Sequence, residues 1–188
     1  MWDSSFLDGT DHHVIFSRRN YYGPILFKIK LGLLLSADFS EVFITRSNPG
    51  SWPDVMPDER KYYQTIDEVR ANYTAGKKTE DAQIMFTFRS PDKKLNLEKY
   101  LVEICYDDPK IKVPFKNGEI EGRDLIKSAL EKAVEKYDRP TYKIVKREHT
   151  GRCKCYDFYT ALKENEYQKF VDCFDISDHL SSKQISKS

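Results

Sequence analysis

The sequence predicts an α+β protein with mostly antiparallel sheets. Several short runs alternate apolar and polar residues, as strands do, and longer stretches carry apolar residues at helical spacing. Short turns separate neighbouring strands, which favours antiparallel pairing. We therefore expect the element order βββα-βββα-ββα, with about three helices packed on the sheets.

Three strands and one helix are predicted in the first third of the chain. The strands are expected at residues 14–18, 25–35 and 42–45, ahead of a loop at 47–57 that is rich in proline. A helix is expected over residues 58–73, where acidic residues favour the N-terminus and apolar residues recur on one face. This block supplies the first βββα unit.

The middle of the chain carries the clearest pattern. Strands are expected where Ile84, Phe86 and Phe88 alternate, and at residues 100–106 and 110–115. A helix is expected next, over residues 122–137. Its apolar residues form one wide stripe: Leu125, Ile126, Ala129, Leu130, Ala133, Val134 and Tyr137. Such a stripe needs a flat apolar surface beneath it, so we expect this helix to lie on a sheet.

Two strands and a helix complete the prediction. The strands are expected at residues 141–146 and 156–159, and the helix at 163–174. The tail at residues 181–188 is rich in Ser and Lys and is expected to fray. We expect residues 1–180 to form a single domain, with a subdivision near residues 76–98 as the alternative.

Charge and composition narrow the classes of function. The 31 basic residues are nearly balanced by 30 acidic ones, which argues against a purely electrostatic nucleic-acid binder. The longest apolar run, residues 25–35, is interrupted by Lys28 and Lys30 and is too short to cross a bilayer. The N-terminus lacks the pattern of a signal peptide. We therefore expect an intracellular protein, cytoplasmic or nuclear, with reduced cysteines and no membrane partner.

One group of cysteine and histidine residues is a candidate metal site. Cys153 and Cys155 are followed by Cys173 and His179, and zinc takes four such ligands in a tetrahedron. The spacing between the first two cysteines is tighter than the gap of two to four residues in common zinc motifs. The favoured interpretation is that Cys173 packs beside a helix stripe while Cys153 and Cys155 point to one face of a strand. We expect no cofactor and keep a structural zinc as the alternative.

Basic and aromatic residues gather in one predicted hairpin. Such residues can neutralise phosphates and stack on bases. The members of this candidate nucleic-acid-binding group are Lys143, Lys146, Arg147, Arg152, Lys154 and Tyr156, within the hairpin Tyr142–Tyr159. The patch and the aromatic residues favour RNA or DNA binding, whereas the net charge does not.

A predicted strand at 110–115 is a candidate edge for a partner protein. Lys110 and Lys112 point to one face and Phe115 to the other, and Pro114 lacks the N–H that a central strand needs. An exposed edge can accept a strand from a partner, although lysine and proline also protect edges from unwanted pairing. The 12 tyrosines also suit an interface.

Enzyme signatures are weak in this chain. Asp54 follows a proline, and Asp92-x-Lys94 or Asp108-x-Lys110 loosely completes the carboxylate and lysine pattern of a magnesium-dependent nuclease. A chain this rich in charge produces such triplets by chance. No Gly-rich phosphate loop, G-x-S-x-G, H-E-x-x-H or C-x-x-C occurs. A metal-dependent hydrolase therefore ranks last among the alternatives.

Part of the chain resembles a known fold family. The run Ile111–Phe115, Gly118, the helix from Asp124 and the run Tyr142–Val145 resemble the ββαβ opening of a ubiquitin-like, Ras-associating β-grasp domain. The resemblance covers about a quarter of the chain, residues 101–147, and rests on a structural pattern, so it implies no binding residues. Our leading hypothesis is a non-catalytic adaptor or assembly domain that binds another protein, and nucleic-acid binding is the runner-up.

Overall fold

Helices and mostly antiparallel strands make up the protein, which confirms the predicted α+β class. The computed structural model describes residues 4–11, 23–72, 84–89, 97–115, 117–136, 141–147, 159 and 164–174. Contacts divide the chain into two units. The first unit contains residues 1–16 and 31–100, and the second contains residues 17–30 and 101–188.

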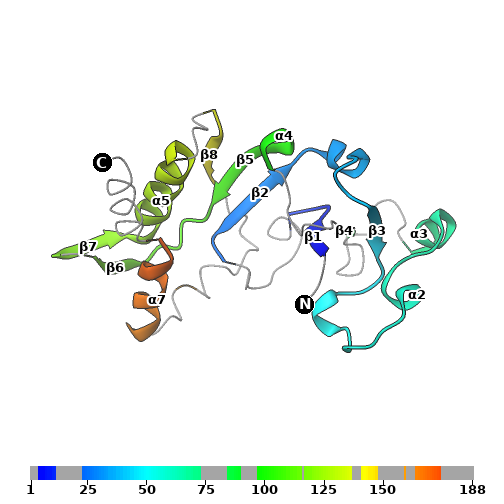
Figure 1. Ribbon diagram of the computed structural model, residues 1–188. Helices are drawn as coiled ribbons and strands as arrows, with labels where there is room; N and C mark the ends of the chain where they lie inside the picture. Colours follow the sequence, from blue (N-terminus) through cyan, green and yellow to red (C-terminus); the bar gives the residue numbers. More distant parts are fainter. Residues whose placement is uncertain are drawn as a thin grey trace, which may run out of the picture. The chain divides into compact units, whose positions relative to one another are not determined.

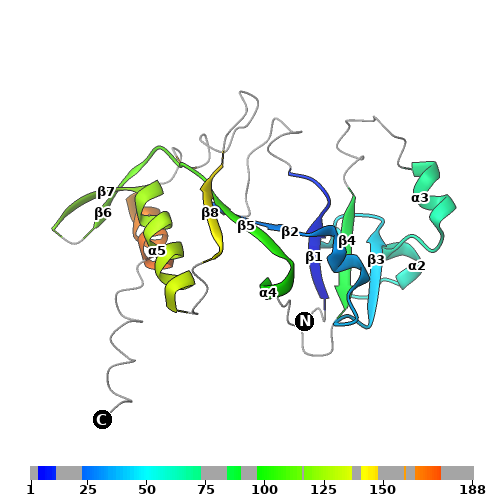
Figure 2. The same cartoon turned by 90° about the horizontal axis from the view of Figure 1, so that it is seen from above.

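An antiparallel sheet in the order β1-β4-β3 organises the first unit (Figure 2). Its strands are β1 (Ser4–Asp8), β4 (Met85–Arg89) and β3 (Glu41–Thr45). The central strand is the most buried, because it is covered on both edges and packs Phe88 against Phe39. The expected strand at 14–18 lies outside the described residues.

Short helices fill the connections of the first unit. They are η1 (Leu31–Leu35), η2 (Pro49–Ser51), α2 (Asp58–Lys61), α3 (Ile66–Asn72) and α4 (Leu97–Tyr100). The single helix expected over 58–73 is thus two helices. Tyr62 interrupts it in an extended conformation and bridges to Thr45 at the end of β3.

Aromatic packing explains why the helix stops at Tyr62. The Tyr62 ring is buried, stacks on Phe43 with centroids 4.4 Å apart and meets the edge of Trp52 at 5.6 Å. The guanidinium of Arg89 lies 4.9 Å from the centroid of Phe43 and also bonds Asp58 at 2.8 Å. These contacts outweigh the helical preference of the local sequence, since aromatic burial dominates core energetics.

The second unit is built on a sheet in the order β2-β5-β8 (Figure 1). Its strands are β2 (Ile25–Ile29), β5 (Leu101–Tyr106) and β8 (Lys143–Lys146). β2 pairs antiparallel with β5, and β8 pairs parallel with β5. The strand expected over 25–35 ends at Ile29, where a β-bulge disturbs the pairing and η1 follows.

A hairpin and two helices complete the described part of the second unit (Figure 1). They are β6 (Lys112–Phe115), β7 (Gly118–Glu121), α5 (Gly122–Lys136) and α7 (Glu164–Phe174). α5 buries much of its predicted stripe, including Leu125 and Ile126, and touches β5, β7, β8 and α7. α7 packs against β6.

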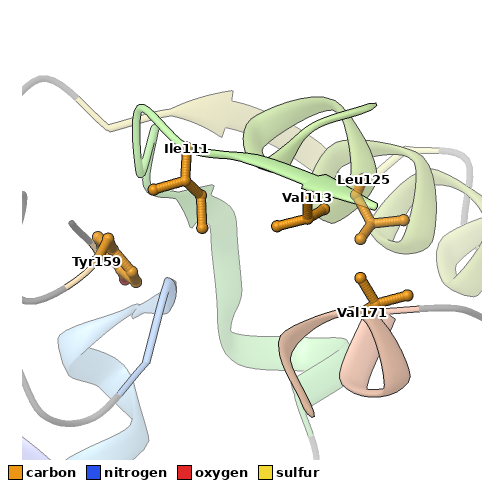
Figure 3. Close-up of a cluster of buried hydrophobic side chains, with 5 residues drawn as sticks. All are labelled: Ile111, Val113, Leu125, Tyr159 and Val171. Carbon is orange, nitrogen blue, oxygen red and sulfur yellow. The ribbon is translucent and has the colours of Figure 1, made fainter. Parts of the chain in front are cut away.

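Five buried residues join this hairpin to the helices. Figure 3 shows Val113 of β6 facing Leu125 of α5 and Val171 of α7, with Ile111 and Tyr159 at the other end of the cluster. The structure departs from the ββαβ opening of a β-grasp domain. β7 is an additional strand, and β8 pairs with β5 and not with the hairpin.

Candidate partner-binding site

Strand β2 forms one edge of the sheet in the second unit. Within the described residues it pairs only with β5, in a register that sets Ile25 opposite Tyr106 and Phe27 opposite Ile104. The backbone N–H of Asp107 donates to the C=O of Pro24 at 2.8 Å and extends the same register. This bond fixes which backbone groups of β2 point toward β5.

The backbone groups of Ile25 and Phe27 point away from β5. Along an antiparallel strand, every second residue bonds the neighbour and the residues between them face outward. Pro24 bonds β5, so Leu26 and Lys28 do as well, and Ile25 and Phe27 present their N–H and C=O groups at the outer edge. No hydrogen bond joins these groups to another described residue. We call Ile25–Phe27 the open edge.

Nothing in the residues of the open edge blocks a further strand. Pro24 lacks an N–H, but that group would point toward β5, so the proline leaves the outer edge intact. The bulge between Lys28 and Ile29 lies beyond the open edge. Bulges, prolines and lysines are the usual protection of an edge, and here they flank the open edge without interrupting it.

Side chains next to the open edge are apolar or neutralised. Phe27 is 46% exposed, and Val102 of the central strand β5 is 50% exposed. The Lys28 ammonium donates to Glu103, whose second carboxylate oxygen lies 3.3 Å from the Lys143 ammonium. This hydrogen bond, which the Lys28 ammonium donates and the Glu103 carboxylate accepts, raises the pKa of Lys28 and lowers the pKa of Glu103. Both groups therefore stay charged and paired.

The edge predicted from the sequence, Lys110 to Phe115, has fewer backbone donors that could bond a partner strand. The Gly122 N–H donates to the Ile111 C=O at 2.8 Å, so alternate residues of β6 bond β7, and Lys112 and Pro114 face outward. Because Pro114 has no N–H, Lys112 is the one outward donor within β6.

The named side chains of that edge also have partners. Lys110 bonds Asp108 at 2.6 Å, and the Lys112 ammonium lies 3.9 Å from Glu121. Phe115 packs against the buried cluster of Figure 3. Lys112 therefore remains the most exposed of the three, with its charge turned toward β7.

The basic group proposed for nucleic acid is partly engaged within the protein. Arg147 is only 7% exposed, and its guanidinium lies 3.2 Å from the Asp107 carboxylate, which also accepts a bond from the Tyr159 hydroxyl at 3.1 Å. Lys143 pairs with Glu103, while Lys146 is exposed. Arg152, Lys154 and Tyr156 lie outside the described residues. Of the described members, Lys143 and Lys146 are both exposed, and Lys143 is paired with Glu103.

The candidate metal ligands are only partly covered by the described residues. Cys173 is exposed on α7, while Cys153, Cys155 and His179 lie outside them. Across the ranges that the structure describes, no three His, Cys, Asp or Glu side chains are grouped so that they could hold a metal ion. In the hydrolase pattern, Asp108 is buried and bound to Lys110 and Arg123.

Comparison with known proteins identifies no similar protein. No family model, no curated protein and no solved structure matches the chain. None of the described helices is both long enough and apolar enough to span a membrane. The open edge is accordingly assigned from its own geometry. Its sequence signal was the alternation of residues 25–29, but that alternation predicts a strand and does not reveal whether its outer edge is paired.

Proposed function

We propose that the protein is a non-catalytic interaction domain that binds an extended segment of a partner protein along β2. The main support for this proposal is that the N–H and C=O groups of both Ile25 and Phe27 face outward and bond no other described residue. Two donors and two acceptors at the repeat of a β-strand are best satisfied by another strand, as in recognition by strand addition.

The surrounding chemistry supports a protein partner over a nucleic acid. The open edge carries apolar side chains, and the nearest lysine is neutralised by Glu103. A phosphate backbone would need unpaired cations at this position. We also propose a cytoplasmic or nuclear location, since the free thiols Cys105 and Cys173 suit a reducing compartment.

Photo-crosslinking in the native cells tests this proposal. Benzoylphenylalanine replaces Phe27 in one variant and Val102 in the other. Val102 is the matched control, because it is similarly exposed but sits on the central strand, which is paired on both sides. We expect position 27 to give protein adducts that map to one extended segment, and position 102 to give few.

A proline at Ile25 provides the second arm. It removes an outward N–H and no bond to β5, so β2 should stay in its sheet. We expect the adducts from position 27 to fall at least about fivefold when Ile25→Pro is added, a loss comparable to one backbone hydrogen bond. Equal adducts from positions 27 and 102, adducts to nucleic acid, or no adducts at all would refute the proposal.

A further inference from the structure

The open edge is complementary to a second copy of itself. Identical chains usually assemble about a two-fold axis, and a two-fold axis perpendicular to the sheet sets two identical strands antiparallel. If this axis passes through Leu26, Ile25 of one copy lies opposite Phe27 of the second copy, and Phe27 lies opposite Ile25. Both residues face outward, so each pair exchanges two backbone hydrogen bonds.

We propose that two copies of this chain pair through β2 in this register and join their sheets into one continuous sheet. The inference rests on the proposed function and names the occupant of the same edge. All four outward groups of each open edge are used, and none is left over. The backbone groups of Pro24 and Lys28 face β5 in each copy, so neither residue needs to donate a hydrogen bond across the new interface.

Charge and side-chain contacts favour this register over its neighbours. Lys28 lies opposite Pro24 of the second copy, so the two lysines do not face each other. A parallel in-register pairing, or an axis through Lys28, would set like charges side by side, which is unfavourable. With the axis at Leu26, its two copies meet as an apolar pair, and each Phe27 lies beside an isoleucine. The net charge of +1 adds little repulsion between copies.

Amide hydrogen exchange of the pure protein tests the register residue by residue. The N–H groups of Leu26 and Lys28 bond β5 and should exchange slowly at every concentration. Those of Ile25 and Phe27 should exchange fast in dilute protein, and about tenfold more slowly once most of the chain is dimeric. Sedimentation over about 1 µM to about 1 mM, the range in which weak dimers form, should show the mass doubling in parallel.

A pair of variants tests whether the doubling of mass depends on β2. Phe27→Pro removes an outward N–H and should keep the chain monomeric, whereas Val102→Lys, on the central strand, should dimerise like the wild type. If Phe27→Pro does not fold, the exchange data on the wild type still decide. Slow exchange at Ile25 and Phe27 that rises with concentration supports the dimer.

The failure of self-pairing and the failure of the proposed function look different. A chain that stays monomeric throughout, with fast exchange at Ile25 and Phe27, overturns self-pairing. Adducts from position 27 to a different protein would then leave the proposed function standing. A dimer whose Ile25 and Phe27 amides stay fast would place the contact elsewhere and overturn the inference.

Discussion

Arg147 donates a hydrogen bond to the Asp107 carboxylate at 3.2 Å, and both side chains are almost fully buried. The two residues follow directly after the parallel strands β8 and β5, and the Arg147 N–H also bonds the Tyr106 C=O. Asp107 in turn bonds Pro24 through its backbone, just ahead of the open edge. The ion pair and these backbone hydrogen bonds therefore join the ends of β5 and β8 to the start of β2.

Removing one member of this pair should destabilise the protein strongly. We expect Arg147→Met to lower the free energy of unfolding by about 3–5 kcal/mol, because the Asp107 charge would remain buried without its partner. Urea unfolding at pH 7 measures the loss. Lys146→Met, on an exposed neighbour, should change stability by about 0.5 kcal/mol or less. A fully stable Arg147→Met that merely loses nucleic-acid binding would favour the runner-up hypothesis instead.

Local sequence patterns correctly predicted the elements whose formation is set by the spacing of their own apolar residues. The stripe of α5 is such a case: Leu125 and Ile126 are buried, as their spacing indicates. β7 was not predicted, because Ile120 is its one apolar residue and alternation cannot be detected from a single position. The split between α2 and α3 was not predicted either, since Tyr62 is held by Phe43 and Trp52, which are distant in sequence.

The roles of the candidate site residues were harder to predict, because they depend on contacts with residues far away in the sequence. Arg147 stands among basic residues and was assigned to a phosphate contact, while Asp107, its partner, lies 40 positions earlier. Phe27 was recognised as part of a strand, but its open outer edge follows from the pairing of β2 with β5, about 75 residues away. Pairing between remote segments is not encoded in alternation, so an edge cannot be told from a central strand by pattern alone.

Asp108 should make the stability of the protein sensitive to acid. Burial tends to raise the pKa of this carboxyl, but hydrogen bonds from the Lys110 ammonium and backbone, with the charge of Arg123, lower it below its usual value. A lowered pKa in the folded state adds stability above the unfolded pKa of about 3.9, and that stability is lost as the pH falls through the folded value.

Urea unfolding of Asp108→Asn across pH measures this contribution. We expect the variant to be less stable than the wild type at pH 7, and the difference to shrink as the pH falls below about 3.9. Asp67→Asn, at an exposed residue paired with Arg70, serves as the control and should follow the wild type closely. A difference that stays constant from pH 7 to strong acid would contradict the assignment.

Gly122 should not tolerate a methyl group. A Cβ at this position would lie 3.0 Å from Pro109 Cγ and 3.1 Å from Ile111 Cγ1, tighter than nine in ten Cβ contacts, so these neighbours would have to shift. Alanine in a helix usually stabilises relative to glycine, yet we expect Gly122→Ala to cost about 1–3 kcal/mol through overpacking. Gly118→Ala, where a Cβ meets nothing within 4 Å, is the control. Thermal unfolding compares the two, and a stabilised Gly122→Ala would be the contrary result.

Two buried hydroxyl groups in the first unit should contribute to stability in a coupled, non-additive way. Thr45 Oγ1 lies 2.8 Å from Thr87 Oγ1, and both residues are buried. Valine at one position leaves the other hydroxyl unsatisfied, so each single variant should lose about 1–3 kcal/mol. Valine at both positions should cost less than the sum of the singles, because no polar group is stranded. Strict additivity in urea unfolding would show that the hydroxyls do not interact.

Cysteine alkylation separates the two interpretations of Cys173. This thiol is exposed on α7, whereas burial raises the pKa of the Cys105 thiol, so iodoacetamide should modify Cys173 in the native protein and Cys105 only after unfolding. A zinc-bound thiolate is shielded from alkylation, and a chelator would release it. We expect the same rate at Cys173 with and without chelator, followed by peptide mass spectrometry. A marked acceleration by the chelator, together with about one zinc ion per chain in the purified protein, would instead support the site formed by Cys153, Cys155, Cys173 and His179.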